Sequence, residues 1–214
     1  MRWRFSIILI ASIIGGIALC YRNFRKANPK TSGYKVLSYA ADETNKMELA
    51  RLNEHSRTLA DFAKQHHYNR HYSFLIDMRL PSGSKRFFIY DFIKDSVLSA
   101  GLVTHGSGSD AGDSLRFSNI PESNCTSLGK YRIGSSYNGK FGLAYKLYGL
   151  DPTNSKAFER FVVLHSHPCV PSGNVSPQPI CQSWGCPTVS PSFLSVLKTY
   201  LDKTEAPMLL SIFY

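Results

Sequence analysis

The sequence contains few cysteines, few acidic residues and no internal repeat. Its 214 residues include five cysteines, too few for a small scaffold built on disulfides, and an odd number leaves at least one thiol unpaired within the chain. Only 15 residues are acidic. Asp110, Asp113 and Glu122 are not spaced as the paired carboxylates of an acid–base catalyst. The lack of repeats and long low-complexity runs excludes a repeat architecture.

Basic residues outnumber acidic ones, and the formal net charge is +10. Such a surface attracts polyanions, including anionic lipid headgroups and wall polymers. No basic stripe is interleaved with aromatic residues that could stack on bases. Gly106–Ser109 is glycine-rich but lacks the lysine of a phosphate-binding loop. We therefore expect no nucleic-acid partner. Several of the positive charges cluster just after the apolar N-terminal run, at Arg22, Arg25, Lys26 and Lys30.

The N-terminus predicts export. A short basic stretch, residues 1–5, precedes a charge-free apolar run over residues 6–20, which is typical of a signal peptide or signal anchor. Leu19 is bulky where a lipoprotein signal prefers a small residue before Cys20, so a lipidated cysteine is the least favoured alternative. We expect residues 1–21 to be the signal segment, with residues 5–21 anchoring the chain in the inner membrane. Each alternative places the rest of the protein on the periplasmic side of the cell envelope.

After a linker over residues 22–44, one domain is expected over residues 45–214. Met47 to Gln65 carries apolar residues at helical spacing, including Met47 and Leu49. Short β-rich segments then dominate, the first three forming an antiparallel meander. A late helix should begin with Ser190 as N-cap and Pro191 at its first position. This pattern predicts a mainly β fold, a sandwich or open barrel with a few peripheral helices. The expected strands are 73–80, 85–92, 97–104, 130–137, 143–148, 161–165 and 208–213.

The segment 161–190 carries the strongest chemical signal. His165 ends an apolar stretch, and Cys186 follows in the turn Ser183-Trp184-Gly185-Cys186. A thiol becomes a strong nucleophile as a thiolate, so it needs a nearby base such as His165. Gly185 lets backbone N–H groups turn toward a developing oxyanion. These residues predict a cysteine nucleophile, a histidine base and a backbone oxyanion site.

This pattern resembles the His…Ser/Thr-x-Gly-Cys signature of the L,D-transpeptidases, the YkuD-like murein enzymes. The usual motif has His at the position of Trp184, and Arg or Asn two places after the cysteine, where Pro187-Thr188 stand here. The Ser-x-Gly-Cys-Pro sequence resembles the branch known as the murein L,D-transpeptidase catalytic domain family. The similarity covers residues 45–214, and other matching segments are 103–109, 117–119, 127–131 and 139–142.

The resemblance implies an L,D-transpeptidase-like fold and an exported cysteine acyltransferase. Its substrates would be peptidoglycan stem peptides, and no cofactor or metal would be needed. Two alternatives are an L,D-carboxypeptidase or endopeptidase acting on peptidoglycan, and a membrane-tethered wall-binding protein without catalysis. Four further residues are expected to contact substrate: His105, His167, Ser183 and Trp184. Turn formation is an equal alternative for Ser183, and loop structure is an equal alternative for His105. His167 is a second candidate for the base.

Two other cysteines, Cys169 and Cys181, lie between His165 and Cys186. In an oxidising compartment they could form a disulfide, and the sequence leaves this open. Together with the histidines they also suggest a zinc cluster. However, His-x-His-x-Cys and Cys-x4-Cys fit the usual spacing of zinc ligands poorly. We therefore expect no metal site.

Overall fold

The computed structural model describes residues 34–112 and 114–214, with side chains from residue 46 onward. The expected signal segment, residues 1–21, lies outside this part of the chain. All the strands belong to one unit, Glu48–Tyr214. No helix in the described residues is long and apolar enough to cross a membrane.

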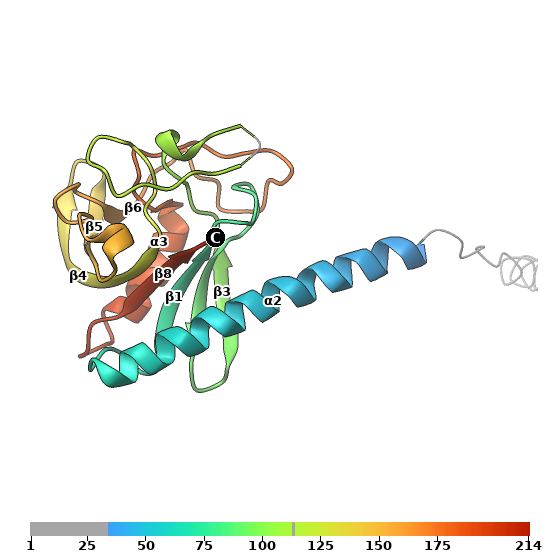
Figure 1. Cartoon of the computed structure of the whole chain (residues 1–214), viewed down its shortest axis with the longest axis horizontal. Helices are drawn as coiled ribbons and strands as arrows, with labels where there is room; N and C mark the ends of the chain where they lie inside the picture. The colour runs from blue at the N-terminus through green and yellow to red at the C-terminus, as the bar shows by residue number, and fades with distance from the viewer. Residues whose placement is uncertain (1–33, 113) are drawn as a thin grey trace, which may run out of the picture. The chain divides into compact units, whose positions relative to one another are not determined.

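Eight strands form one mixed sheet, in the order β3-β2-β1-β8-β4-β5-β6-β7 (Figure 1). Seven of them lie within or beside the segments expected from the sequence. The meander β1-β2-β3 is antiparallel, as expected. The prediction of a mainly β fold is thus confirmed. The strands are β1 (Tyr72–Asp77), β2 (Phe87–Asp91), β3 (Ser96–Gly101), β4 (Gly129–Gly139), β5 (Gly142–Gly149), β6 (Val163–Ser166), β7 (Thr188–Val189) and β8 (Leu209–Phe213).

Two parallel pairings were not predicted. β8 lies between β1 and β4, and it is parallel to β1 and antiparallel to β4. The two-residue strand β7 runs parallel to β6, with His165 opposite Thr188. Two short 3₁₀ turns, η1 (Ser107–Ser109) and η2 (Pro152–Asn154), lie in the connections. The β6–β7 pairing brings the segments of His165 and Cys186 together.

The first described helix, α2 (Tyr34–Gln65), begins earlier than the helix expected from Met47. It includes part of the segment expected to be a linker. Leu52, Leu59 and Ala63 are buried in one cluster with Leu209, a spacing that follows one helix face. The part of α2 from residue 48 lies across β1 and β8 (Figure 1).

Met47 and Leu49 do not join this packed face. They are 62% and 50% exposed, although their apolar character suggested core positions. The buried face of α2 therefore begins at Leu52 rather than at Met47.

The helix α3 (Pro191–Leu201) covers the opposite face of the sheet. The Ser190 hydroxyl accepts a hydrogen bond from the Phe193 N–H at 3.2 Å, and Pro191 is the first helical residue. The predicted N-cap is therefore confirmed. Leu194 and Leu197 are buried in the main core. The two helices thus sandwich the sheet between two apolar clusters.

A buried ion pair connects α2 with the sheet. Asp77, at the end of β1, is fully buried, and its carboxylate accepts two hydrogen bonds from Arg51, at 2.7 and 2.9 Å. The Arg79 N–H donates a third at 2.9 Å. Removal of one partner from such a pair leaves the other charge desolvated and unpaired.

We expect Arg51→Met to lower the free energy of unfolding by about 3 kcal/mol, measured by urea denaturation. Lys198→Met is the matched control, because Lys198 pairs with Asp202 on the surface, where both side chains are about half exposed. An exposed pair contributes about 0–1 kcal/mol. If the two substitutions lowered the free energy of unfolding equally, the buried Asp77 carboxylate would not need Arg51 for its stability in the folded protein.

Candidate active site

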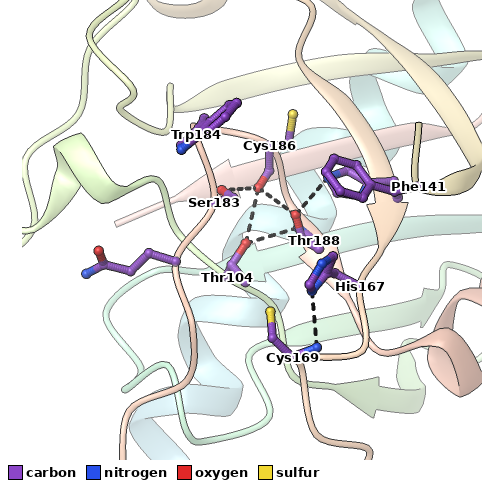
Figure 2. A pocket seen from close by; sticks show the side chains of 10 residues that line it. Thr104, Phe141, His167, Cys169, Ser183, Trp184, Cys186 and Thr188 are labelled. Carbon is purple, nitrogen blue, oxygen red and sulfur yellow. Dashed lines mark hydrogen bonds between the residues drawn. The ribbon is translucent and has the colours of Figure 1, made fainter. Parts of the chain in front are cut away.

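A pocket of about 200 Å³ opens where β6 and β7 pair (Figure 2). The parallel register places His165 on β6 beside Thr188 on β7, two residues after Cys186. Thr104 fixes the turn from the other side: its hydroxyl donates to the Cys186 carbonyl at 3.2 Å and accepts from the Thr188 N–H at 3.2 Å. The described lining residues are Thr104, Phe141, His165, His167, Cys169, Gln182, Ser183, Trp184, Cys186 and Thr188.

The hydrogen bonds of His165 define its tautomer. Its Nδ1 lies 3.1 Å from the Ser166 carbonyl. A carbonyl can only accept, so Nδ1 carries the hydrogen. Nε2 is then a free base, and it accepts from the Thr188 hydroxyl at 3.0 Å. Burial lowers the pKa of His165, and nearby His167 acts in the same direction, opposed by the bond to Ser166. The ring is therefore neutral at neutral pH, as a general base must be.

The Cys186 thiol contacts backbone groups rather than a histidine. Its sulfur accepts from the Val163 N–H at 3.4 Å and donates to the Phe161 carbonyl at 3.7 Å. In Figure 2 the sulfur points away from Thr188 and His167. No hydrogen bond joins it to His165 within the described structure. Burial raises the pKa of the Cys186 thiol, while the Val163 N–H and the positive charge of Arg160 oppose that rise.

The turn before Cys186 depends on a glycine. Gly185 has φ +108°, and a Cβ there would lie 2.7 Å from the Cys125 carbonyl oxygen. Its N–H donates to the Ser183 hydroxyl at 3.2 Å, and that hydroxyl donates to the Cys186 carbonyl at 2.6 Å. Ser183 therefore closes the turn. The Trp184 side chain is 80% exposed at the rim of the pocket.

These bonds bear on the expected oxyanion site. The Gly185 N–H already has the Ser183 hydroxyl as its acceptor. Within residues 34–112 and 114–214, the N–H groups of Trp184 and Cys186 have no hydrogen-bond acceptor. The sequence suggests the backbone N–H groups of Trp184, Gly185 and Cys186 as oxyanion donors, and those of Trp184 and Cys186 are available without breaking an existing bond.

His167 lies on the same side of the pocket as His165. The Phe141 ring stacks on His165, with centroids 5.2 Å apart, and meets His167 edge-on at 5.4 Å. The Nδ1 of His167 accepts from the Cys169 N–H at 3.2 Å. Phe141 thus covers both imidazoles with an apolar surface; the matching segment 139–142 contains this residue, but its contact with the histidines was not predicted.

Cys169 and Cys181 form a disulfide, with Cα atoms 6.1 Å apart. The bridge closes the loop between His167 and Gln182, both of which line the pocket. Cys125 and Cys186 are free thiols. In the described residues no group of three or more His, Cys, Asp or Glu side chains is arranged to hold a metal ion.

His105 lies behind the pocket rather than among its described lining residues. Its Nδ1 accepts from the guanidinium of the buried Arg86 at 3.0 Å, and its carbonyl accepts from the Ser183 N–H at 3.0 Å. Burial, followed by the charge of Arg86, lowers the pKa of His105 to about 4. A direct contact between His105 and substrate stays a prediction; the visible contact is with the Ser183 turn.

Sequence reasoning missed five residues of this region: Thr104, Phe141, Arg160, Gln182 and Thr188. Thr188 follows the Ser-x-Gly-Cys-Pro motif directly, so its position could have suggested a partner for His165. Thr104 and Phe141 lie in the matching segments 103–109 and 139–142, but nothing within these segments singled them out, and Arg160 lies outside every matching segment.

Comparison with known proteins places the chain in a family. Residues 34–209 match the L,D-transpeptidase catalytic domain, and the chain belongs to this family. This confirms the resemblance seen in the motif. A search of curated protein sequences found no significant match.

Solved structures show distant similarity. The L,D-transpeptidase from Mycobacterium smegmatis is 13% identical with a TM-score of 0.41, over 67% of this chain and 59% of that chain. The helical cell shape determining protein Pgp2 from Campylobacter jejuni is 11% identical with a TM-score of 0.44, over 66% and 47%. The chain thus spans about three fifths of the mycobacterial structure.

We expect Gly185→Ala to destabilise the protein by about 2 kcal/mol, because alanine is strained at positive φ and its Cβ would meet the Cys125 carbonyl. Gly173→Ala is the control, since its Cβ would enter open space and its φ is not positive. Thermal denaturation compares the variants. Similar melting temperatures would mean that the turn adapts to a side chain.

The buried His105 should make stability depend on pH. Its folded-state pKa of about 4 lies below the ordinary 6.5, so the unfolded chain binds the proton more readily. The contribution of His105 to the free energy of unfolding is then fully present above pH 6.5, and it is lost as the pH drops toward 4. His105→Gln should give a shallower decline in melting temperature over this window. An unchanged slope would assign the pH dependence to other groups.

Proposed function

We propose that this protein is a cysteine acyltransferase that acts on peptidoglycan stem peptides, with Cys186 as nucleophile and His165 as base. The observation that carries the proposal is the parallel β6–β7 register, which brings a buried neutral imidazole and the Cys186 turn into one pocket. The family membership supplies the substrate class.

The reaction begins with movement of the thiol. Rotation about the Cα–Cβ bond of Cys186 takes the sulfur from the backbone of residues 161–163 into the pocket. The proton then passes to Nε2 of His165, whose present partner is the Thr188 hydroxyl. That hydroxyl can turn to the Cys186 carbonyl, 3.4 Å away, which frees Nε2 to accept.

The thiolate attacks the carbonyl carbon of the L-centre residue of a tetrapeptide donor, and a new C–S bond forms. The charge on the carbonyl oxygen is stabilised by the Cys186 N–H, and by the Gly185 N–H if Ser183 releases it. The C–N bond to the terminal D-residue then breaks. The leaving amine takes the proton from His165, and a thioester remains on Cys186.

The thioester is resolved by a second nucleophile. An amine from another stem peptide gives a 3–3 crosslink, whereas water releases the shortened stem peptide, which is L,D-carboxypeptidase activity. Both need a proton acceptor, a role that His165 can repeat. His167, Ser183 and Trp184 are the proposed substrate contacts around the thiol, with the exposed Trp184 ring shielding the thioester from water.

Export to the cell envelope is part of this proposal, with residues 5–21 as an anchor in the inner membrane. The Cys169–Cys181 disulfide supports it, because disulfides persist in oxidising compartments such as the periplasm. A protein that acts on peptidoglycan must also reach that side of the membrane.

One observation favours the non-catalytic alternative, a wall-binding protein. The thiol has only backbone partners among the described residues, and burial raises its pKa. If the thiol never leaves this position, the pocket could bind a stem peptide without cleaving it. Covalent capture of substrate distinguishes the two possibilities.

Incubation with a disaccharide tetrapeptide should add the acyl mass to the protein, detected by intact-protein mass spectrometry. Cys186→Ala should abolish this adduct because it removes the nucleophile. Cys125→Ala should keep it, since Cys125 is the other free thiol of the described chain. Persistence of turnover in Cys186→Ala would sink the assignment. Binding without an adduct in the wild type would favour the wall-binding protein.

A further inference from the structure

Arg160 precedes β6 and connects the loop before β4 with the Cys186 turn. Its guanidinium donates to the Cys125 carbonyl at 2.6 Å and to the Ser118 carbonyl at 2.9 Å. Weaker contacts reach the hydroxyls of Ser127 at 3.3 Å and Ser123 at 3.5 Å. Four groups from one loop thus hold the guanidinium in place.

The charge of Arg160 is not neutralised by these contacts. All four acceptors are uncharged carbonyl or hydroxyl groups. Among the ion pairs of residues 46–112 and 114–214, none includes Arg160. A half-buried cation bound only by neutral acceptors keeps its full field, and that field is stronger here than in water.

This cation lies against the residue before the nucleophile. A Cβ built on Gly185 would be 3.4 Å from Nη2 of Arg160. The same Nη2 donates to the Cys125 carbonyl, which crowds Gly185 from the same side. The glycine therefore allows the turn and the guanidinium to approach closely. The charge of Arg160 also acts on Cys186 itself, where it opposes the effect of burial on the thiol pKa.

We propose that Arg160 is a positioning residue whose fixed positive charge stabilises the Cys186 thiolate and clamps the loop behind it. This inference deepens the proposed function and rests on it, because a thiolate matters only if Cys186 reacts. It extends the base role of His165: the histidine removes the proton, and the guanidinium favours the anion that is left.

The other charged or titratable groups around the thiol do not supply this field. His165 and His167 border the pocket, and the imidazole of His165 is neutral at neutral pH. Lys140 is not among the described lining residues, and its ammonium lies 5.6 Å from the centroid of the Phe141 ring. The described lining residues include no carboxylate and no lysine or arginine.

The test is the pH dependence of Cys186 alkylation by iodoacetamide, followed by peptide mass so that Cys125 is scored separately. Arg160→Gln keeps a hydrogen-bond donor but removes the charge, and Arg160→Lys keeps the charge. We expect Arg160→Gln to move the alkylation profile upward by about one pH unit, which is about a tenfold lower rate at pH 7. Arg160→Lys should recover most of that rate. At a pH where the thiol is fully ionised, all variants should react alike.

A second variant leaves Arg160 untouched. Ser123→Asp would place a carboxylate next to the guanidinium, since the Ser123 hydroxyl is 3.5 Å from it, and it should shift the profile in the same direction. Arg132→Met is the control, because Arg132 stacks on the Tyr148 ring and is not among the described residues that line the pocket. It should leave the profile unchanged.

An unchanged profile in Arg160→Gln or, if that variant does not fold, in Ser123→Asp would overturn the proposal and leave Arg160 as a structural clamp. Alkylation needs no turnover, so it is independent of the acyl adduct. A shifted profile without an adduct in the wild type would uphold the charge effect on the thiol and contradict the transferase. An acyl adduct together with an unshifted alkylation profile would support the transferase and contradict the charge effect of Arg160 on the thiol.

Discussion

The pairing of β8 with both β1 and β4 holds the domain together. β1, β2 and β3 form one antiparallel group, and β4, β5 and β6 form another; only β8 hydrogen-bonds to both. Every residue of β8 is buried. Leu209 and Phe213 belong to the cluster under α2, whereas Leu210 and Ile212 belong to the main core. One strand therefore contributes to both apolar layers as well as to the hydrogen bonds of the sheet.

The candidate site depends on this strand through a series of neighbours. β8 positions β4, β4 positions β5, and β5 pairs with β6, where His165 lies opposite Ala144. The last step, from β6 to β7, rests on only two paired positions. Thr104 reinforces it with side-chain bonds to the Cys186–Thr188 segment. Rigid strands thus hold the imidazole, whereas a short turn holds the thiol.

Local patterns predicted much of the fold. Runs of β-branched and aromatic residues identified the strands, and Ser190-Pro191 identified the start of α3. The order of the strands could not be predicted, because the parallel pairing of β1 with β8 joins segments more than 130 positions apart. β7 has only two residues, too few to show the alternation of apolar and polar side chains that marks a strand. The prediction that Met47 and Leu49 pack in the core was wrong, because an apolar side chain on a helix does not show whether another surface covers it. In the site, the motif singled out His165 and Cys186, which line one pocket, but it did not predict the contact of Thr188 with His165 or the direction of the sulfur, since these depend on rotamers.

The disulfide and the thiol together define the chemical environment that the site requires. Cys169 and Cys181 are oxidised beside the same pocket in which Cys186 is reduced. An environment reducing enough to open the bridge would release the loop between His167 and Gln182, whereas a strongly oxidising one would also oxidise the Cys186 thiol. Burial raises the pKa of the Cys186 thiol, and because thiolates oxidise faster than thiols, this position slows oxidation of the sulfur. The resting position of Cys186 thereby allows two opposite sulfur oxidation states to persist in one small pocket.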